Sequence, residues 1–227
     1  MSDKVEHVEQ DVVMQLQKFW QRNGKTLSIV VIVIALVIGG WYGYKEFILK
    51  PKEERAADAM YKAEQYFAID SSNLVLNGDG TNKGMLYVIK NYSGTKVANL
   101  AKFYAGVSYL KLGNYAKAVD YLKDFSTGAK QIQMVAYGAL GDALSEEGKK
   151  DDAVDAYKKA ANVLTEDAGS CAEYLFRAGL LSETMGKNQQ AVELYKQIKE
   201  KYPATEKGYQ IDKYIYRLSI EKNDFGN

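Results

Sequence analysis

The residue types that carry most enzyme chemistry are scarce in this sequence. The chain has one histidine, His7, and one cysteine, Cys171. Nucleophilic catalysis by serine or cysteine needs a neighbouring base, and a zinc site needs several histidine or cysteine ligands at defined spacing. His7 lies in the N-terminal tail, and a lone cysteine within a helical run is ordinarily a small packing residue. We therefore predict a protein that is not an enzyme and has no metal site and no cofactor.

Acidic residues occur in pairs, but their positions indicate helix ends. Asp151–Asp152 and Glu146–Glu147 start or end predicted helices, where carboxylates cap the chain or face solvent. The segment from Asn77 to Thr81 has the spacing of a calcium-binding loop. Its twelfth position is Val88, where a bidentate glutamate would be required. We therefore predict no calcium site there.

Composition excludes nucleic acid as a partner. The chain has 227 residues, of which 30 are basic and 29 acidic, so its formal net charge is +1. Binding to phosphate backbones needs a basic excess or a basic cluster, and neither is present. About 180 residues follow the apolar segment described next, which is enough for one domain with its own core.

A charge-free apolar segment runs from Thr26 to Tyr44, with a lysine on each side. At about 1.5 Å per residue, a helix of this length matches a hydrocarbon core of about 30 Å. A signal peptide has a shorter apolar core, whereas this segment ends in Trp41, Tyr42 and Tyr44, which are typical of a membrane interface. We predict a transmembrane helix at 26–44. The tail at 1–25 either forms a short amphipathic helix or extends the membrane helix.

Charges beside the segment do not decide its orientation, because basic residues are nearly balanced between its two sides. A short first tail often stays in the cytoplasm while a long following domain is exported, and we expect that arrangement here. Within the segment, Ala35, Gly39 and Gly43 recur every four residues and so lie near one face. Small residues at this spacing let a second helix approach closely, so we predict these three as a membrane helix packing site.

Three glycines mark an internal repeat in the C-terminal half. Gly113, Gly148 and Gly186 are 35 and 38 residues apart, near the period of about 34 residues of a tetratricopeptide helix pair. Other positions keep the same register: a small residue precedes each anchor by seven positions, an alanine follows by five, and a large residue follows by nine. These residues are Gly106, Gly141 and Gly179; Ala118, Ala153 and Ala191; and Leu122, Tyr157 and Tyr195. The small residues are expected where two helices of a pair cross, and the large ones in the groove made by the next pair.

The fold class that follows is all-α, an N-terminal transmembrane helix followed by a tetratricopeptide-repeat α-solenoid over 45–227. We predict a degenerate pair at 53–92, repeats at about 99–132, 134–167 and 172–205, and a closing helix at 207–223.

A solenoid of this kind binds chains on its concave face, which is formed by the first helix of each pair. By the repeat register, the predicted partner-binding residues are Phe103, Val107, Leu110, Asp142, Ser145, Glu173, Phe176 and Leu180. Such an apolar and mildly acidic groove suits unfolded or helical segments. Phe103 and Phe176 could equally pack between helices, and that alternative stays open.

The N-terminal sequence resembles a known family. The run Val8–Gln10, then Leu16–Trp20 and Asn23–Lys25, and the span that ends in Ile38–Trp41 are similar to the start of the ancillary subunits of the bacterial Sec translocon, the YfgM type. The loop at 77–82 and the clean glycine anchors are closer to a Bacteroidota-like branch. The specific part of this resemblance is residues 8–44.

The resemblance implies a periplasmic, chaperone-like helper in the bacterial inner membrane, with its N-terminus in the cytoplasm. Its implied partners are the SecYEG channel, a membrane-anchored periplasmic chaperone of the parvulin isomerase type, and exported polypeptides. Two alternatives remain: a repeat scaffold for envelope or outer-membrane protein assembly or secretion, and an accessory subunit of a membrane enzyme.

Overall fold

The computed structural model describes the backbone of residues 2–224 and the side chains of Met14 and of residues 17–219. Within this part of the chain all regular structure is helical, and one isolated bridge joins Gly78 to Lys83. The chain divides into two compact units, Met1–Lys52 and Glu53–Asn227.

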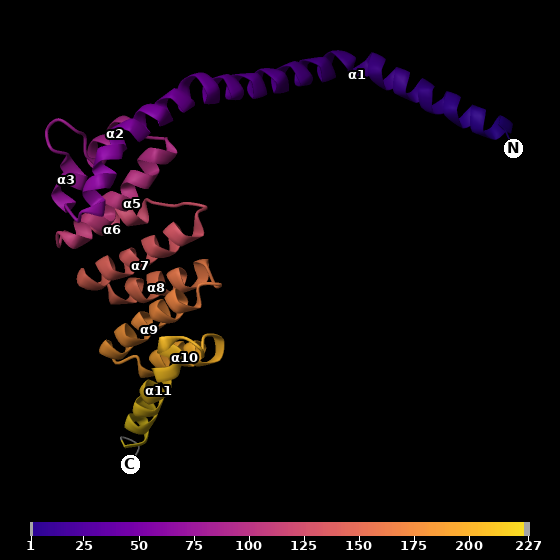
Figure 1. Cartoon of the computed structure of the whole chain (residues 1–227). Helices are drawn as coiled ribbons and strands as arrows, with labels where there is room; N and C mark the ends of the chain where they lie inside the picture. The colour runs from indigo at the N-terminus through magenta and orange to yellow at the C-terminus, as the bar shows by residue number, and fades with distance from the viewer. Residues whose placement is uncertain (1, 225–227) are drawn as a thin grey trace. The chain divides into compact units, whose positions relative to one another are not determined.

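The first unit is built on one long helix, α1 (Ser2–Tyr44), drawn in indigo in Figure 1. A single π-helical segment, Lys45–Leu49, joins it to α2 (Lys50–Ala68). The backbone is therefore helical through the N-terminal tail. The side chains that would form an amphipathic face there, from Val5, Val8, Val12 and Leu16, lie outside the described residues.

The middle of α1 is apolar on every side. Its large apolar side chains are all exposed, and they occupy consecutive positions around the helix: Ile29, Val30, Val31, Ile32, Val33, Ile34, Leu36, Val37 and Ile38. A surface helix of a soluble domain would have one apolar stripe and one polar face. This helix is long and apolar enough to cross a membrane.

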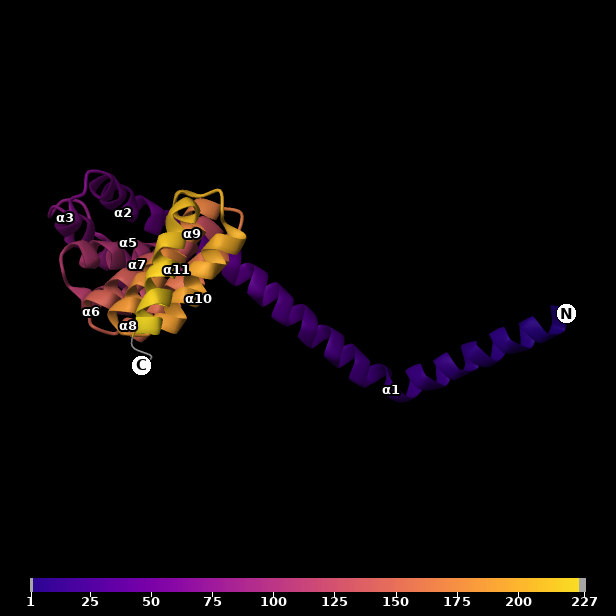
Figure 2. The ribbon, with the colours of Figure 1, turned by 90° about the horizontal axis from the view of Figure 1, so that it is seen from below.

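The second unit is a stack of antiparallel helices, as the two views in Figures 1 and 2 show. After α2 come two short helices and then longer ones, each packed on the next. They are α3 (Ser72–Asn77), α4 (Met85–Asn91), α5 (Lys96–Lys111), α6 (Tyr115–Lys123), α7 (Lys130–Glu146), α8 (Lys150–Val163), α9 (Ala168–Thr184), α10 (Asn188–Lys201) and α11 (Glu206–Asp224). The prediction of an all-α repeat solenoid is confirmed.

The three anchor glycines close three first helices in the same way. Gly113, Gly148 and Gly186 have φ angles of 72°, 84° and 70°, a left-handed conformation that only glycine adopts without strain. After each, the next residue donates its N–H to a carbonyl five positions back, as Asn114 does to Tyr109 at 2.9 Å. This closure satisfies helix-end carbonyls and reverses the chain.

Each helix pair crosses at a second glycine. A Cβ added to Gly106, Gly141 or Gly179 would lie 2.6, 2.5 or 2.3 Å from the side chain of Leu122, Tyr157 or Tyr195, respectively. The expectation that these large residues fill the groove of the next pair gives only part of their contacts: Tyr195 does contact Tyr214 of α11, with 5.5 Å between the ring centres, but all three also pack within their own pair. Each lies on the glycine of its own pair, because the missing side chain leaves room for a ring or a leucine at the crossing.

The first pair is irregular. α2 runs alongside α5, since the Glu53 carboxylate accepts the backbone N–H groups of Lys96 (2.5 Å) and Val97 (3.2 Å), and the Phe67 ring lies 4.8 Å from that of Tyr104. The place of a second helix is taken by α3 and α4 together, separated by a loop. The Glu53 contact places a negative charge at the positive end of α5.

Asp79 organises the loop between α3 and α4. Its carboxylate accepts hydrogen bonds from the backbone N–H groups of Thr81 (3.0 Å) and Asn82 (2.6 Å), from the Asn82 amide (2.8 Å) and from the Tyr66 hydroxyl (2.6 Å). The hydrogen bond from Tyr66, followed by those from Asn82, holds the pKa of Asp79 well below its usual range. The calcium-like spacing in this loop thus serves an internal hydrogen-bond centre.

Candidate functional site

The predicted binding face has three parts: apolar side chains on α5, paired polar side chains on α7 and α9, and an aromatic ring of α9 that α11 covers. In α5, Phe103, Val107 and Leu110 are partly buried against the core. The Phe103 ring lies 5.6 Å from both Tyr104 and Phe125. These three side chains pack inward and still keep part of their surface accessible, so they form an apolar area on α5.

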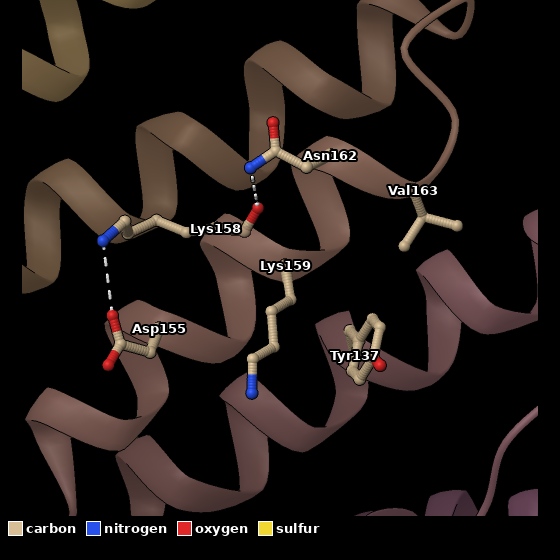
Figure 3. A pocket seen from close by; sticks show the side chains of 6 residues that line it. All are labelled: Tyr137, Asp155, Lys158, Lys159, Asn162 and Val163. Carbon is tan, nitrogen blue, oxygen red and sulfur yellow. Dashed lines mark hydrogen bonds and ion pairs between the residues drawn. The ribbon is translucent and has the colours of Figure 1, made fainter.

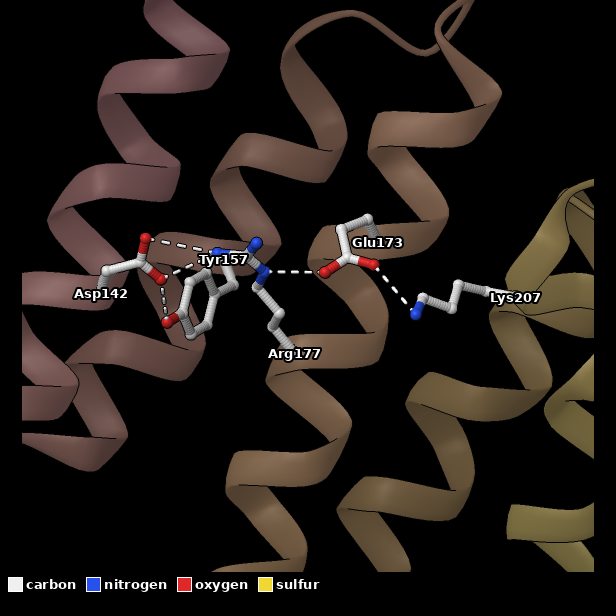
Figure 4. Close-up of polar contacts among 5 residues, drawn as sticks. All are labelled: Asp142, Tyr157, Glu173, Arg177 and Lys207. Atoms are coloured by element: carbon white, nitrogen blue, oxygen red, sulfur yellow. Dashed lines mark hydrogen bonds and ion pairs between the residues drawn. The ribbon is translucent and has the colours of Figure 1, made fainter.

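In α7 and α9 the face is polar and internally paired. Arg177 donates from Nη1 to both oxygens of Asp142, at 3.0 and 3.3 Å, and from Nε to Glu173 at 2.9 Å. Lys207 Nζ lies 3.3 Å from the other oxygen of Glu173, and the Tyr157 hydroxyl donates to Asp142 at 2.7 Å. Figure 4 shows the five side chains as a continuous polar row from α7 across α9 to α11.

This pairing changes the electrostatics of the face. Burial raises the pKa of Glu173, but the hydrogen bonds and charges of Arg177 and Lys207 outweigh it, so the pKa lies below its usual value. Burial, and then the hydrogen bond to Asp142, raise the pKa of Tyr157. The two predicted acidic residues are therefore neutralised by two cations, and this part of the face is balanced in charge.

A similar arrangement recurs one pair further on. Tyr195 donates its hydroxyl to Glu183 at 2.5 Å, and the same carboxylate pairs with Arg217 of α11. In both cases a tyrosine of the second helix and an arginine of the following first helix share one carboxylate. We call Tyr157, Asp142 and Arg177 the first clamp, and Tyr195, Glu183 and Arg217 the second clamp.

The C-terminal helix covers part of the predicted face. Phe176 is 7% exposed, and its ring contacts Tyr214 at 4.9 Å and Tyr195 at 5.9 Å, with Lys207 Nζ 4.6 Å above it. Phe176 thus packs beneath α11. Ser145 is partly exposed, and Leu180 is 37% exposed. Of the three residues predicted on α9, Phe176 is covered, whereas Leu180 stays open and the paired Glu173 keeps 38% of its side chain exposed.

A shallow groove lies over α7, where the short helix α6 ends at Lys123. One part, of about 420 Å³, lies between α7 and α8 (Figure 3). The adjoining part, of about 390 Å³, reaches Leu122 and Phe125, and both parts share Tyr137, Asp155 and Lys159. The groove has an aromatic and aliphatic floor and charged rims. No sequence prediction included it, because its lining comes from helices that only the tertiary structure brings together.

The predicted helix packing residues of α1 are open. Ala35 and Gly39 are exposed and Gly43 is partly exposed. No atom of the described chain lies within 4 Å of a Cβ placed on Gly39 or Gly43. A second helix would therefore meet no steric obstacle there.

Chemistry at Cys171 is limited by its surroundings. The thiol is buried, its Sγ donates to the Leu164 carbonyl at 3.2 Å, and burial raises its pKa. Among the described side chains, no group of three or more histidine, cysteine, aspartate or glutamate residues is arranged to hold a metal ion.

Several residues of this site were missed by reasoning from sequence. These residues are Arg177, Lys207, Glu183 and Arg217. The pairs Arg177–Asp142, Lys207–Glu173 and Arg217–Glu183 each join two helices, over 35, 34 and 34 positions. One signal was available: Tyr157 and Tyr195 share a repeat position, so a polar partner for each hydroxyl could have been expected.

Comparison with known proteins assigns the chain to a repeat family. A model described as "Tetratricopeptide repeat-like domain" matches residues 17–140, and two models described as "Tetratricopeptide repeat" match residues 135–163 and 173–205. No curated protein matches the chain significantly.

Among solved structures, the chain is similar to "kinesin light chain nearly identical TPR-like repeats" of Podosopora anserina. The TM-score is 0.52 at 14% identity, over 75% of this chain and 88% of that one. At this identity the likeness concerns the fold alone. Because the first family model spans more than half of the 227 residues, the chain belongs to the tetratricopeptide repeat-like domain family.

Proposed function

We propose that this protein is a non-catalytic, membrane-anchored repeat module that binds partner proteins beside a membrane machine. One observation carries the proposal: α1 exposes large apolar side chains on all sides, and the same chain continues into a tetratricopeptide stack. A helix with this surface is stable in lipid, because its backbone groups form hydrogen bonds within the helix and its apolar side chains contact lipid tails in place of water. A repeat stack offers an extended surface for other chains.

Two surfaces of the second unit suit a protein partner. The apolar area of Phe103, Val107 and Leu110 and the groove over Tyr137 both combine accessible apolar side chains with polar neighbours. Anchoring adds to their effect, because a tether raises the local concentration of a binding surface without any new contact. Weak contacts at such surfaces are then sufficient.

The membrane machine that we propose is the Sec translocon, with the second unit in the periplasm. This proposal rests on the resemblance of residues 8–44 to its ancillary subunits. The matching family model begins at residue 17, so it includes the apolar helix as well as repeats. The proposed partners are the SecYEG channel, a membrane-anchored parvulin-type chaperone and emerging exported chains.

The test is purification of the full chain at its native level from detergent-solubilised membranes, with mass spectrometry of the associated proteins. We expect the channel and a periplasmic isomerase. A matched control replaces residues 26–44 by an unrelated span of equal length, which should keep the protein in the membrane and lose the channel. Outer-membrane assembly components, or a membrane enzyme, recovered without the channel would contradict the translocon assignment.

Orientation is tested separately, by adding protease to intact spheroplasts. We expect the second unit to be digested from outside, because it is proposed to be periplasmic. Full protection in spheroplasts, with digestion only after lysis, would place the repeats in the cytoplasm and contradict the proposal.

A further inference from the structure

A shallow depression of about 390 Å³, called the cavity below, lies open to solvent on the second unit, between α2 and the loop that Asp79 closes. Arg55 and Lys62 line it from α2, and Thr81, Asn82 and Lys83 line it from the loop. It is separate from the groove over Tyr137 and from the predicted binding face, since it shares no lining residue with either.

The cations of this cavity are not neutralised by ion pairs. No carboxylate of a described residue lies within ion-pair distance of Arg55, Lys62 or Lys83. Lys62 donates to the Gln65 amide oxygen at 2.9 Å, and the Lys83 ammonium lies 5.1 Å from the centre of the Tyr87 ring. Asp58 is the one acidic residue of the lining. The lining therefore carries three positive charges against one negative charge.

Both walls of the cavity are held in place. Asp79 fixes the loop through four hydrogen bonds, and one of these comes from Tyr66 of α2 at 2.6 Å. The bridge between Gly78 and Lys83 closes the base of the same loop. Because Tyr66 connects the loop to the helix that carries Arg55 and Lys62, the backbone of both walls is already in place, and a ligand has to order only the side chains.

We propose that this cavity binds a phosphate group. A guanidinium binds phosphate oxygens through paired N–H donors, ammonium groups add point charges, and the Thr81 hydroxyl can donate to a remaining oxygen. The source is either the phosphodiester of an anionic phospholipid or free phosphate. The chain favours the lipid, because Arg55 follows Tyr44 by only 11 residues, which rise about 16 Å in the helical conformation of this segment.

The test compares the full chain, in uncharged detergent, with two triple variants. The cavity variant is Arg55→Gln, Lys62→Gln, Lys83→Gln. The matched control, Lys130→Gln, Lys196→Gln, Lys201→Gln, removes the same charge from exposed positions outside the cavity. The thermal midpoint is followed against dihexanoylphosphatidylglycerol and against sodium phosphate, each at constant ionic strength, because salt screens exposed charges.

We expect saturable stabilisation of the natural chain and of the control, and at least about a tenfold weaker apparent affinity in the cavity variant. A response to the lipid alone identifies a headgroup site, and an equal response to both ligands identifies a free-phosphate site. Equal responses of the two triple variants, or no saturable response of the natural chain, would overturn the proposal. If the cavity variant does not fold, Lys83→Gln alone tests the same expectation, because Lys83 lies in an exposed loop.

Discussion

The hydroxyl of Tyr157 donates a hydrogen bond of 2.7 Å to Asp142, a residue of the other helix of its pair. Arg177 of the following pair donates to the same carboxylate. Asp142 therefore joins a contact within one repeat to a contact between two repeats. In a solenoid, where each repeat contacts only its neighbours, such junctions transmit stability along the stack.

The first clamp should show energetic coupling. We expect Tyr157→Phe to lower the free energy of unfolding by about 1 kcal/mol, because it removes one hydrogen bond. Combined with Arg177→Gln, it should show a coupling of at least about 0.5 kcal/mol in urea unfolding, since both groups act on Asp142. Tyr157→Phe with Arg217→Gln is the control, and its effects should add because Arg217 belongs to the second clamp. Additive effects in both pairs would contradict a shared carboxylate.

The crossing glycines should tolerate no side chain. A Cβ on Gly179 would lie 2.3 Å from Tyr195 Cε1, so Gly179→Ala should destabilise the protein by about 1–3 kcal/mol through overpacking. Gly128 is the matched control, because a Cβ there meets nothing within 4 Å. Thermal unfolding of both variants tests this, and equal melting temperatures would show that Tyr195 can move aside at little cost.

Acid should weaken the loop between α3 and α4. The pKa of Asp79 is lower in the folded state than its unfolded value of about 3.9. Its stabilisation is therefore present above that value and is lost as pH falls toward the folded pKa. We expect Asp79→Asn to destabilise the protein at pH 7 and the difference from the natural chain to shrink between about pH 5 and pH 3. Urea midpoints across this range test the sign, and a difference that grows with acid would refute it.

Glu53 should stabilise α5 from outside that helix. Its carboxylate accepts two backbone N–H groups at the N-terminus of α5, so Glu53→Gln should cost about 1 kcal/mol by weakening charge-assisted bonds. Glu54→Gln, at an exposed neighbouring position, is the matched control and should be nearly neutral. Chemical unfolding compares the two, and equal losses would mean that general charge alone is responsible.

The small residues of α1 should affect the binding of membrane partners but not the stability of the second unit. Replacing Gly39 and Gly43 by leucine blocks close approach of a second helix, so copurification with a membrane partner should fall severalfold. Melting of the second unit should not change, because no atom of the described chain lies near these positions. Replacing Val33 and Val37 by leucine is the control. Unchanged recovery of the partner in both variants would remove this face from consideration.

Sequence reasoning reached the parts of the fold that depend on local pattern. The repeat was visible because Gly113, Gly148 and Gly186 each need the same left-handed conformation at a helix end. The apolar helix was visible because residues 26–44 contain no charge. The fold class followed from these two features and is confirmed by the structure and by the family match.

The binding face was harder to predict. The repeat register shows which residues share a helix face, but not which side chains of other helices cover them or pair with them. The register placed Phe176 on the same face as Phe103, and only the stacking of α11 shows that the Phe176 ring is covered by Tyr214. Likewise, the sequence predicts an acidic groove from Asp142 and Glu173, and only the structure shows that Arg177 and Lys207 pair with these carboxylates.

The sequence by itself thus determined the helical class, the apolar span and the glycines at which helices turn, since these depend on neighbours within a few residues. The glycines at which helices cross were visible only through the repeat, because each contacts a residue 16 positions further on. Tertiary structure decided which charges are paired, which aromatic rings are covered and where Arg55, Lys62 and Lys83 share one cavity. The physical reason is distance along the chain. Arg177 reaches a carboxylate 35 positions before it, and only the rotation from one helix pair to the next brings the two together.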